Sequence, residues 1–293
     1  MVDVGSIVQA MLTGLMQGGV YALISIGLTI IFGVLGIINF AHAEFMMLGM
    51  YAALVMFLSF SISPLLAFFL LLPLFLVLGA AIQRVLIEPI LDEQEDAQLI
   101  LTFGILLILQ NGALVFFGSS PETLNIAYSS EAYRFLGFTV NQAKAIAFVF
   151  ALGASGVTFA FLRYTEFGRA IRATADNSSA AQYAGINVRR VYMAAFGLGI
   201  ALTGCAGALL VMYYPVSPTV GFDFIVLMFV VVVLGGLGSV KGALVAGLLI
   251  GVIEGVSTVW LPLELQPAVA FVLFLAVVLL RPQGLFGTAQ RGV

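Results

Sequence analysis

Three polar residues stand close together between two long apolar runs. In GIINFAHAEFMMLG (36–49), Asn39, His42 and Glu44 bring an amide, an imidazole and a carboxylate within six residues, and His42 is the only histidine of the chain. Such a group is typical of a metal site, a proton relay, a channel lining or a helix end at a membrane surface. A single histidine without a thiolate partner argues against zinc, and residues two apart stand about 200° apart on a helix. We therefore predict no metal site.

The elements around this motif are apolar enough to lie in a membrane. Hydrophobic residues make up 62% of the 293 residues and charged residues only 9%, against about 25% in soluble domains. The charge-free stretches 4–43, 45–83 and 97–121 each exceed the roughly 20 residues that a spanning helix needs. We predict an all-α polytopic integral membrane protein, with residues 1–293 forming one transmembrane domain.

About nine spans are expected, or eight if one of the last three is a re-entrant segment. Lys and Arg fall mostly on one side of this arrangement, which predicts an external N-terminus and a cytoplasmic C-terminus. The first apolar run is too long for a cleaved signal. Cys205, the only cysteine, lies inside an apolar run and is expected to be a packing residue. The predicted spans are 7–34, 39–59, 64–85, 97–117, 143–163, 191–213, 223–238, 243–260 and 267–281.

The connections between the spans limit the classes of function. Residues 118–142 are predicted to be an external loop, suited to a small cap or a surface for an external partner. The acidic turn 88–97 is most simply a solvated connection. The sequence has no GxxxxGK[ST], HExxH, CxxC or GxSxG motif, so we expect no bound cofactor and no catalytic residue. No basic face for nucleic acid is expected. Any driving force must come from an ion gradient or from another polypeptide.

The cytoplasmic loop 163–190 is predicted to contain two short helices. Phe167, Ala170, Ile171 and Thr174 have the spacing of one helical face. Asp176 or Asn177 is expected to cap a second helix that ends at Gly185 in the left-handed conformation, and Asn187 to cap the next span. The loop is either an ordinary positive-inside connection or a docking element for a partner's groove.

Four stretches resemble one known family. EFGRAIRATADNSSAAQYAGINVRRV (166–191) resembles the coupling loop, xxGRAxRAxAxDxxxAxxxGINxxRV, of permeases of ATP-binding-cassette importers of the branched-chain amino acid (Liv-type) family. Residues 14–53 are similar to the first two helices of that family, 230–255 (VVVVLGGLGSVKGALVAGLLIGVIEG) to its glycine-rich motif, and RPQGLFG (281–287) to its C-terminal end. The chain looks more like the smaller of the two paired permeases. Ala43 stands where the family usually has glycine.

The resemblance implies an importer permease in a bacterial cytoplasmic (inner) membrane. A second homologous permease would form a heterodimer with this chain, and two ATP-binding subunits would carry ATP and Mg. An external solute-binding protein would deliver branched-chain or related amino acids, although relatives take urea, short amides or aromatic acids. The remaining alternatives are an ion-coupled secondary transporter or channel and, with poorer support, an intramembrane enzyme. The residues implied in ATPase coupling are Phe167, Gly168, Arg169, Arg172, Ala173, Asp176, Gly185 and Ile186.

Polar residues inside the spans are candidates for the transport pathway. Thr13, Gln17 and Tyr21 recur every four residues beside a Gly14-xxx-Gly18 motif that lets another helix approach closely. Intramembrane polar groups face protein or water, so this stripe either lines the pathway or joins helices. Asn111 in the fourth span has the same two interpretations. Asn39 is expected to cap the second span at the cytoplasmic side, and Asn39 with His42 to meet the pathway or its inner gate.

A glycine-rich stretch and two acids complete the candidates. Gly235, Gly236, Gly238 and Ser239 (LGGLGS) are expected either to break a helix beside the pathway or to form an interfacial turn. FGVLG (32–36) is a possible counterpart in the first half. Glu44 and Glu254 are candidates for gating. Lys241 is a conceivable partner of Glu254, but the sequence does not place the two together.

Overall fold

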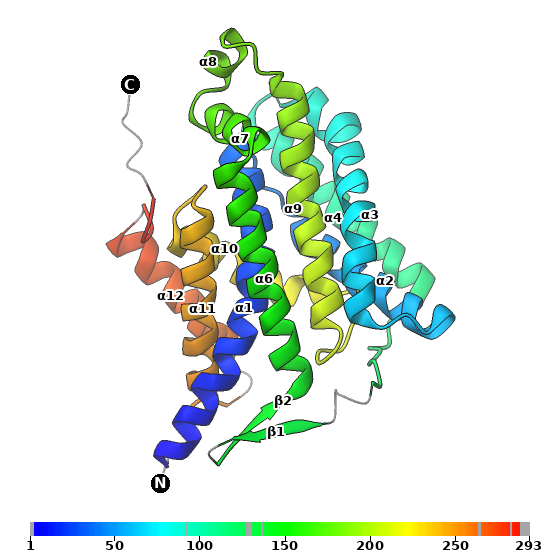
Figure 1. Cartoon of the computed structure of the whole chain (residues 1–293), viewed down its shortest axis with the longest axis vertical. Coiled ribbons are helices and arrows are strands. Elements are labelled where there is room, and N and C mark those ends of the chain that lie inside the picture. The colour runs from blue at the N-terminus through cyan, green and yellow to red at the C-terminus, as the bar shows by residue number, and fades with distance from the viewer. Residues whose placement is uncertain are drawn as a thin grey trace.

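The computed structural model is a bundle of α-helices with one short hairpin (Figure 1). It describes residues 3–91, 93–126, 131–135, 137–262, 265–281 and 283–287. Within these residues, seven helices are long and apolar enough to cross a membrane, and α10 and α12 are shorter apolar helices. The predicted all-α polytopic fold is confirmed, and each predicted segment falls on one of these helices. Their bounds are α1 (Val4–Leu35), α2 (His42–Phe60), α3 (Pro64–Ile82), α4 (Glu95–Phe117), α6 (Gln142–Tyr164), α9 (Val188–Leu210), α10 (Val220–Gly235), α11 (Val240–Ser257) and α12 (Gln266–Leu280).

Helices α1 and α9 form the centre of the bundle. Residues 18–31 of α1 and 199–210 of α9 are buried throughout, as expected for helices that are apolar on all sides. Helices α3, α4 and α6 lie outside them, and each exposes large apolar side chains, among them Phe69, Val115 and Val157. Such faces suit lipid or a second membrane subunit.

Small residues bring the central helices close together. A methyl group added at Gly14 would meet the backbone of Gly251, and one added at Gly18 would meet the backbone of Gly247. The predicted close approach at Gly14-xxx-Gly18 is therefore confirmed, and the neighbour is α11. Helix α9 approaches α1 in the same way through Gly199.

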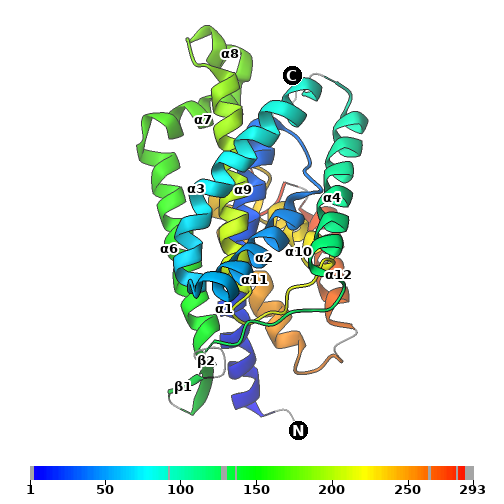
Figure 2. The ribbon, with the colours of Figure 1, turned by 90° about the vertical axis from the view of Figure 1, so that its right-hand side faces the viewer.

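Helix α2 begins in the interior of the bundle. The chain turns at Gly36 (φ 73°) after α1 ends, and residues 37–41 return into the bundle before α2 starts at His42 (Figure 2). His42 Nε2 lies 3.1 Å from the carbonyl oxygen of Ile24, which is about 16 Å before the end of α1 along its axis. The prediction of a helix start at the cytoplasmic surface is therefore wrong. The predicted capping residue is also displaced: Ala41 is the N-cap of α2, and the Asn39 side chain accepts from the Ala41 N–H at 3.1 Å.

The two glycine motifs meet at one end of the bundle. Gly236 (φ 97°) and Gly238 (φ 82°) form a turn between α10 and α11, and the Ser239 hydroxyl accepts a hydrogen bond from the first turn of α11. Gly238 packs directly against Gly33 of α1. Because two residues with positive φ reverse the chain, the LGGLGS segment is a turn between helices, as the second of the two expectations had it.

A β-hairpin lies at the opposite end of the bundle from α7 and α8 (Figures 1 and 2). Strands β1 (Ala132–Phe135) and β2 (Phe138–Asn141) pair antiparallel. The Gln9 side chain of α1 accepts from the Thr139 N–H at 2.9 Å, which joins the hairpin to the start of α1. The predicted external loop 118–142 thus has structure of its own. Its residues 127–130 and 136, like 288–293 of the predicted cytoplasmic C-terminus, lie outside the described residues.

Candidate functional site

Two short helices project from one end of the bundle between α6 and α9 (Figure 1). We call α7 (Glu166–Asp176) and α8 (Ser178–Tyr183) the knob. The Thr165 hydroxyl caps α7, and the Asn177 side chain caps α8, accepting at 2.9 and 2.8 Å from backbone N–H groups. Gly185 ends α8 with φ 86°, and Asn187 caps α9. The predicted pair of capped helices is confirmed, and such capping stabilises each turn by about 1 kcal/mol.

The inner face of the knob packs on the end of α6. Gly168, Ile171 and Thr174 are buried, and a methyl group at Gly168 would collide with the carbonyl oxygens of the last turn of α6. The Arg172 guanidinium donates to the carbonyl oxygen of Leu162. Of the residues predicted to share one helical face, Ile171 and Thr174 are buried, whereas Phe167 is 38% exposed, and Gly168 makes the close contact with α6.

The outer face of the knob is open. Arg169 pairs with Glu166 at 3.3 Å on an exposed surface, and Asp176 and Gly185 are exposed. Ala173 and Ile186 are half-buried. Tyr183 at the tip of α8 is 93% exposed. The knob thus combines a fixed base with an outer surface carrying both aromatic and charged side chains.

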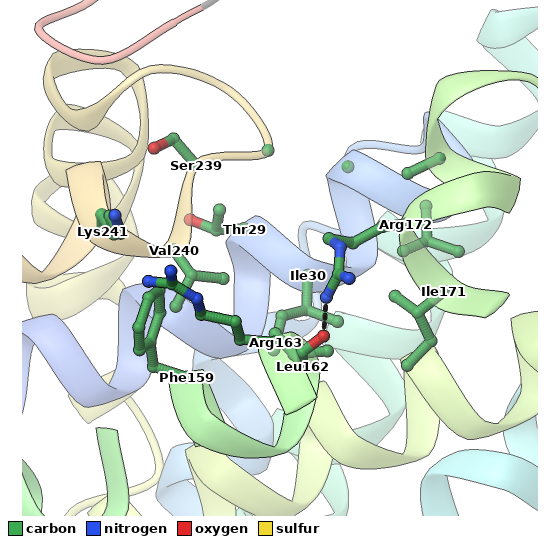
Figure 3. Close-up of a pocket in the computed structure, with 14 residues that line it drawn as sticks. Thr29, Ile30, Phe159, Leu162, Arg163, Ile171, Arg172, Ser239, Val240 and Lys241 are labelled. Atoms are coloured by element: carbon green, nitrogen blue, oxygen red, sulfur yellow. Dashed lines mark hydrogen bonds between the residues drawn. The ribbon is translucent and has the colours of Figure 1, made fainter. Parts of the chain in front are cut away.

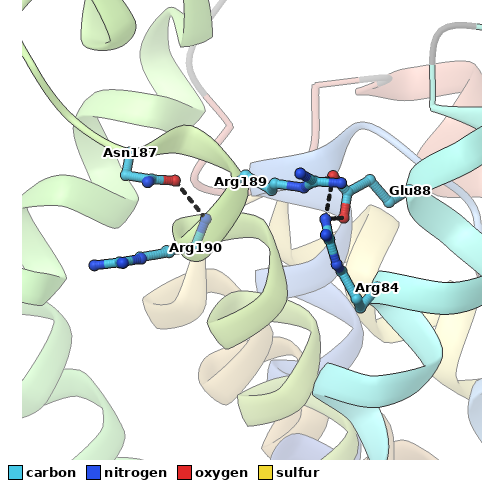
Figure 4. Close-up of polar contacts among 5 residues, drawn as sticks. All are labelled: Arg84, Glu88, Asn187, Arg189 and Arg190. Carbon is cyan, nitrogen blue, oxygen red and sulfur yellow. Dashed lines mark hydrogen bonds and ion pairs between the residues drawn. The ribbon is translucent and has the colours of Figure 1, made fainter.

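An ion-pair cluster holds the base of the knob (Figure 4). Glu88 lies in the helical segment 83–90 that continues α3, and it pairs with Arg84 at 2.8 Å and with Arg189 in the first turn of α9. The Glu88 side chain is only 18% exposed. The start of the 88–97 turn is therefore not a simple solvated connection, as the sequence suggested, since it links α3 to the helix that follows the knob.

A cavity of about 410 Å³ lies beneath the knob (Figure 3). Ile171 and Arg172 of α7 form part of its wall, and Gly238 and Ser239 of the glycine-rich turn form another part. Lys241 reaches its wall from the start of α11, where its ammonium group lies 5.2 Å from the centre of the Phe159 ring. The residues that line this inner cavity are Thr29, Ile30, Gly33, Val34, Phe159, Leu162, Arg163, Ile171, Arg172, Ala175, Gly238, Ser239, Val240 and Lys241.

Two further cavities lie beside α1: the middle one shares lining residues with the inner cavity, and the outer one shares none with the middle one. A middle cavity of about 330 Å³ lies between α6 and α11, with Ile26, Ser155 and Leu244 in its walls. An outer cavity of about 460 Å³ lies between the first half of α1, the start of α6 and the end of α11. We call these three cavities the α1 groove. The groove follows α1 from the knob toward the hairpin end of the bundle.

The outer cavity contains the polar stripe of α1. The Gln17 amide donates to the Tyr21 hydroxyl and accepts from the Lys144 ammonium group at 3.5 Å. The Tyr21 hydroxyl also interacts electrostatically with the Glu254 carboxylate. The suggested pairing of Glu254 with Lys241 is wrong, because thirteen residues of helix separate them by about 20 Å. The cation near Glu254 is Lys144 of α6.

His42 joins three helices in the core. Its Nε2 atom lies 3.1 Å from the carbonyl oxygen of Ile24 and 2.6 Å from the Thr203 hydroxyl. Because a carbonyl only accepts, Nε2 carries the hydrogen, and Thr203 in turn donates to the Gly199 carbonyl at 2.9 Å. His42 is 1% exposed and lies outside the three cavities of the groove. The His42 side chain thus connects α2 to both α1 and α9.

Glu44 is buried beside the start of α10. Its side chain is fully buried, and neither carboxylate oxygen has a hydrogen-bond partner among the described residues. The carboxylate lies against Gly221, where a side chain would collide with it. The positive ends of two helix dipoles, those of α2 and α10, therefore face this carboxylate. The Asn39 amide nitrogen, also buried, has no partner in the same part of the structure.

The other predicted site residues lie apart from one another. Asn111 is exposed on α4, where its amide donates to the Leu107 carbonyl at 2.8 Å. Gly235 and Gly236 pack against the start of α11 and against Gly287. The structure therefore brings Gln17, Tyr21 and Glu254 together and places Asn39, His42, Glu44 and Asn111 elsewhere.

Sequence reasoning did not select Lys144 or Thr203. Lys144 was one of only two basic residues on the predicted external side, which was a usable signal in a chain with 9% charged residues. Thr203 gave no signal, since a single hydroxyl in an apolar helix is ordinary. Its role depends on the depth to which α2 re-enters the bundle.

Comparison with known proteins identifies the family to which this chain belongs. Residues 10–278 match the family model described as the permease component of branched-chain amino acid transport systems. The chain is a member of that permease family. It is 34% identical to the high-affinity branched-chain amino acid transport system permease protein LivH of Salmonella typhimurium, over 96% of both chains. It is 32% identical to LivH of Escherichia coli (strain K12) and to BraD of Pseudomonas aeruginosa, again over 96% of each chain. No solved structure matches it.

The match covers the whole candidate site of this permease. The 10–278 range includes the knob and nearly all of the residues that line the α1 groove. The predicted family and the class of transport permease are therefore confirmed, and the multi-pass membrane character agrees with the apolar helices.

Proposed function

We propose that this permease forms the membrane part of an importer that moves branched-chain amino acids inward across the bacterial cytoplasmic membrane. A second permease subunit pairs with it, two ATP-binding subunits supply the driving force, and an external binding protein delivers the substrate. ATP and Mg are bound by the partner subunits. The named substrates of LivH and BraD support this choice of substrate.

The observation that carries the proposal is the position of the knob. It is capped at each helix start, packed on α6 through Gly168, and continuous with the inner cavity through Arg172. A force applied to its exposed outer face is therefore transmitted to the wall of the groove. A slack positive-inside loop would have neither the caps nor the fixed base.

In this mechanism the knob is cytoplasmic and the hairpin external. ATP binding and hydrolysis in the partner subunits move the knob, and α6 and α9 move with it because the knob is joined to both helices. The inner and outer ends of the α1 groove then open in turn. The small residues between α1 and α11 allow these helices to shift while staying in contact.

Co-purification with the ATP-binding subunits tests the proposal. Arg172→Glu reverses a charge at the base of the knob, and Gly185→Pro removes the left-handed turn that ends α8. Both variants are expected to lose the ATP-binding subunits by at least about tenfold, which corresponds to roughly 1.4 kcal/mol. Arg134→Glu, on the exposed hairpin, is the matched control and is expected to retain them. Full assembly of both knob variants would contradict the proposal.

A further inference from the structure

The outer cavity holds one cation and one anion that interact electrostatically but form no direct ion pair. Lys144 comes from the first turn of α6 and Glu254 from the last turns of α11, and both line the cavity. Both charged groups are half-buried. In the described part of the chain, no ion pair within 4.0 Å joins them.

Such an arrangement is costly unless something completes it. Partly buried charged side chains are usually paired or face a water-filled site, because desolvation disfavours an isolated charge. Lys144 interacts with the Gln17 amide oxygen at 3.5 Å and lies 5.5 Å from the centre of the Tyr213 ring. Glu254 faces the Tyr21 hydroxyl. Each charge thus has a neutral polar neighbour, and both remain turned toward the same space.

Gln17 and Tyr21 fix the spacing of the two charges. The Gln17 amide accepts from Lys144 with its oxygen and donates to Tyr21 with its nitrogen. The Tyr21 ring is itself held edge-on by Phe224, at 5.9 Å between ring centres. Gln17 and Tyr21 both stand on α1, so the polar neighbours of the two charges are held on one rigid element.

The rest of the cavity wall combines small and apolar residues with the polar residues Ser6, Gln9, Thr13 and Thr258. Ala10, Gly14, Gly251 and Val259 occupy its walls, and its volume of about 460 Å³ lies within the range of small-molecule sites. A neighbouring cavity under the hairpin shares Thr13 and Lys144 with it and adds apolar surface. There is therefore room for an aliphatic side chain beside the two charges.

We propose that the outer cavity binds the zwitterionic backbone of an amino acid, with its carboxylate at Lys144 and its ammonium group at Glu254. The ligand supplies a direct ionic partner to each of the two side chains, which form no direct ion pair with each other, and its aliphatic side chain lies on the small apolar residues of the wall. This site would be the first that the substrate meets in the α1 groove after the binding protein releases it. The inference rests on the proposed function, since it gives that function a point of substrate contact.

Ligands that lack one charge test this assignment without requiring transport. The permease–ATPase assembly, without the binding protein, is placed in lipid nanodiscs, and binding of millimolar leucine, leucinol and isocaproate is measured by saturation-transfer NMR. Leucinol lacks the carboxylate, and isocaproate lacks the ammonium group. The wild-type assembly is expected to prefer leucine to both analogues by about tenfold or more, since a charge-assisted hydrogen bond contributes roughly 1.5–3 kcal/mol.

The variants are expected to lose this preference selectively. Lys144→Met, or Lys144→Gln if the first does not assemble, no longer distinguishes leucine from leucinol but still rejects isocaproate. Glu254→Gln no longer distinguishes leucine from isocaproate but still rejects leucinol. Arg134→Gln and Glu122→Gln, which change exposed charges outside the outer cavity, are the matched controls and retain both preferences.

The outcomes separate this inference from the proposed function. Unchanged preferences in folded Lys144 and Glu254 variants overturn the inference even where ATP-driven uptake continues. Wild-type preference for leucine together with an absence of ATP-driven uptake would instead overturn the proposed function. If the variants only raise the KM for the loaded binding protein, the pair belongs to a docking surface, and the inference is again overturned.

Discussion

At the scale of single residues, Glu44 and Gly221 depend on each other. The buried carboxylate lies where any side chain at position 221 would be, and Gly221 is in the first turn of α10. The glycine is therefore required by space, because its φ is not positive. This contact links the start of α2 to the start of α10 in the interior.

Gly221→Ala is expected to destabilise the permease by about 1–3 kcal/mol, because the added methyl group displaces the Glu44 carboxylate. The measurement is a double-mutant cycle on the thermal unfolding of the purified assembly. Glu44→Ala is expected to remove most of the cost of Gly221→Ala, giving a coupling free energy of at least about 0.5 kcal/mol. If the two substitutions change the free energy of unfolding additively, the contact between Glu44 and Gly221 is contradicted. Gly104→Ala, in open space on α4, is the control substitution and is expected to be neutral or slightly stabilising.

At the scale of elements, α7 depends on Gly168 for its contact with α6. The last-turn carbonyl oxygens of α6 occupy the space that a methyl group would need, and Arg172 donates to one of them. Any side chain at position 168 therefore lifts α7 from its base. A lifted knob transmits less of the ATPase movement to α6.

Gly168→Ala is expected to leave transport per ATP hydrolysed reduced by about tenfold while the membrane helices remain folded. The measurement compares substrate uptake with ATP hydrolysis in the same proteoliposomes. Ala173→Gly removes a methyl group from a half-buried residue of the same helix, and it shows how far a change in helix propensity alone, here in the opposite direction, alters coupling. If Gly168→Ala and the wild type transport the same amount of substrate per ATP hydrolysed, the contact at Gly168 is not needed to transmit the ATPase movement.

The helices themselves could be predicted, but their depths could not. Long apolar runs predict spans, and Asn177, Gly185 and Asn187 mark the ends of the knob helices by local chemistry alone. The start of α2 at His42 was misplaced because hydropathy has no information on how far a chain re-enters the bundle. The Lys144–Glu254 arrangement was missed for a related reason: α6 and α11 are far apart in sequence, and only the tertiary packing brings their ends to one cavity.

At the scale of the whole molecule, the α1 groove is predicted to be reached by water from both ends. Cys205 is buried, and its thiol donates to the Phe68 carbonyl, so Cys205→Ala provides a background for labelling. In that background, Gln17→Cys is expected to react with a membrane-impermeant thiol reagent added outside, and Val240→Cys, at a half-buried position of the inner cavity, with the reagent added inside.

Ile108→Cys is the control for this labelling experiment. Ile108 is 72% exposed on α4, on a face suited to lipid, where a thiol does not ionise. The two groove positions are expected to react at least about tenfold faster than this control. Reaction at position 108 as fast as at positions 17 and 240 would contradict a water-accessible groove along α1.

The central claim is that substrate movement through this permease is driven through the knob by ATP. The most direct measurement is the uptake of radiolabelled leucine by proteoliposomes that contain the permease, its partner subunits and an external binding protein. Uptake is expected only with ATP inside and loaded binding protein outside, and it is expected to persist when ion gradients are collapsed. Uptake that continues without ATP and follows an ion gradient would contradict the claim and identify an ion-coupled transporter instead.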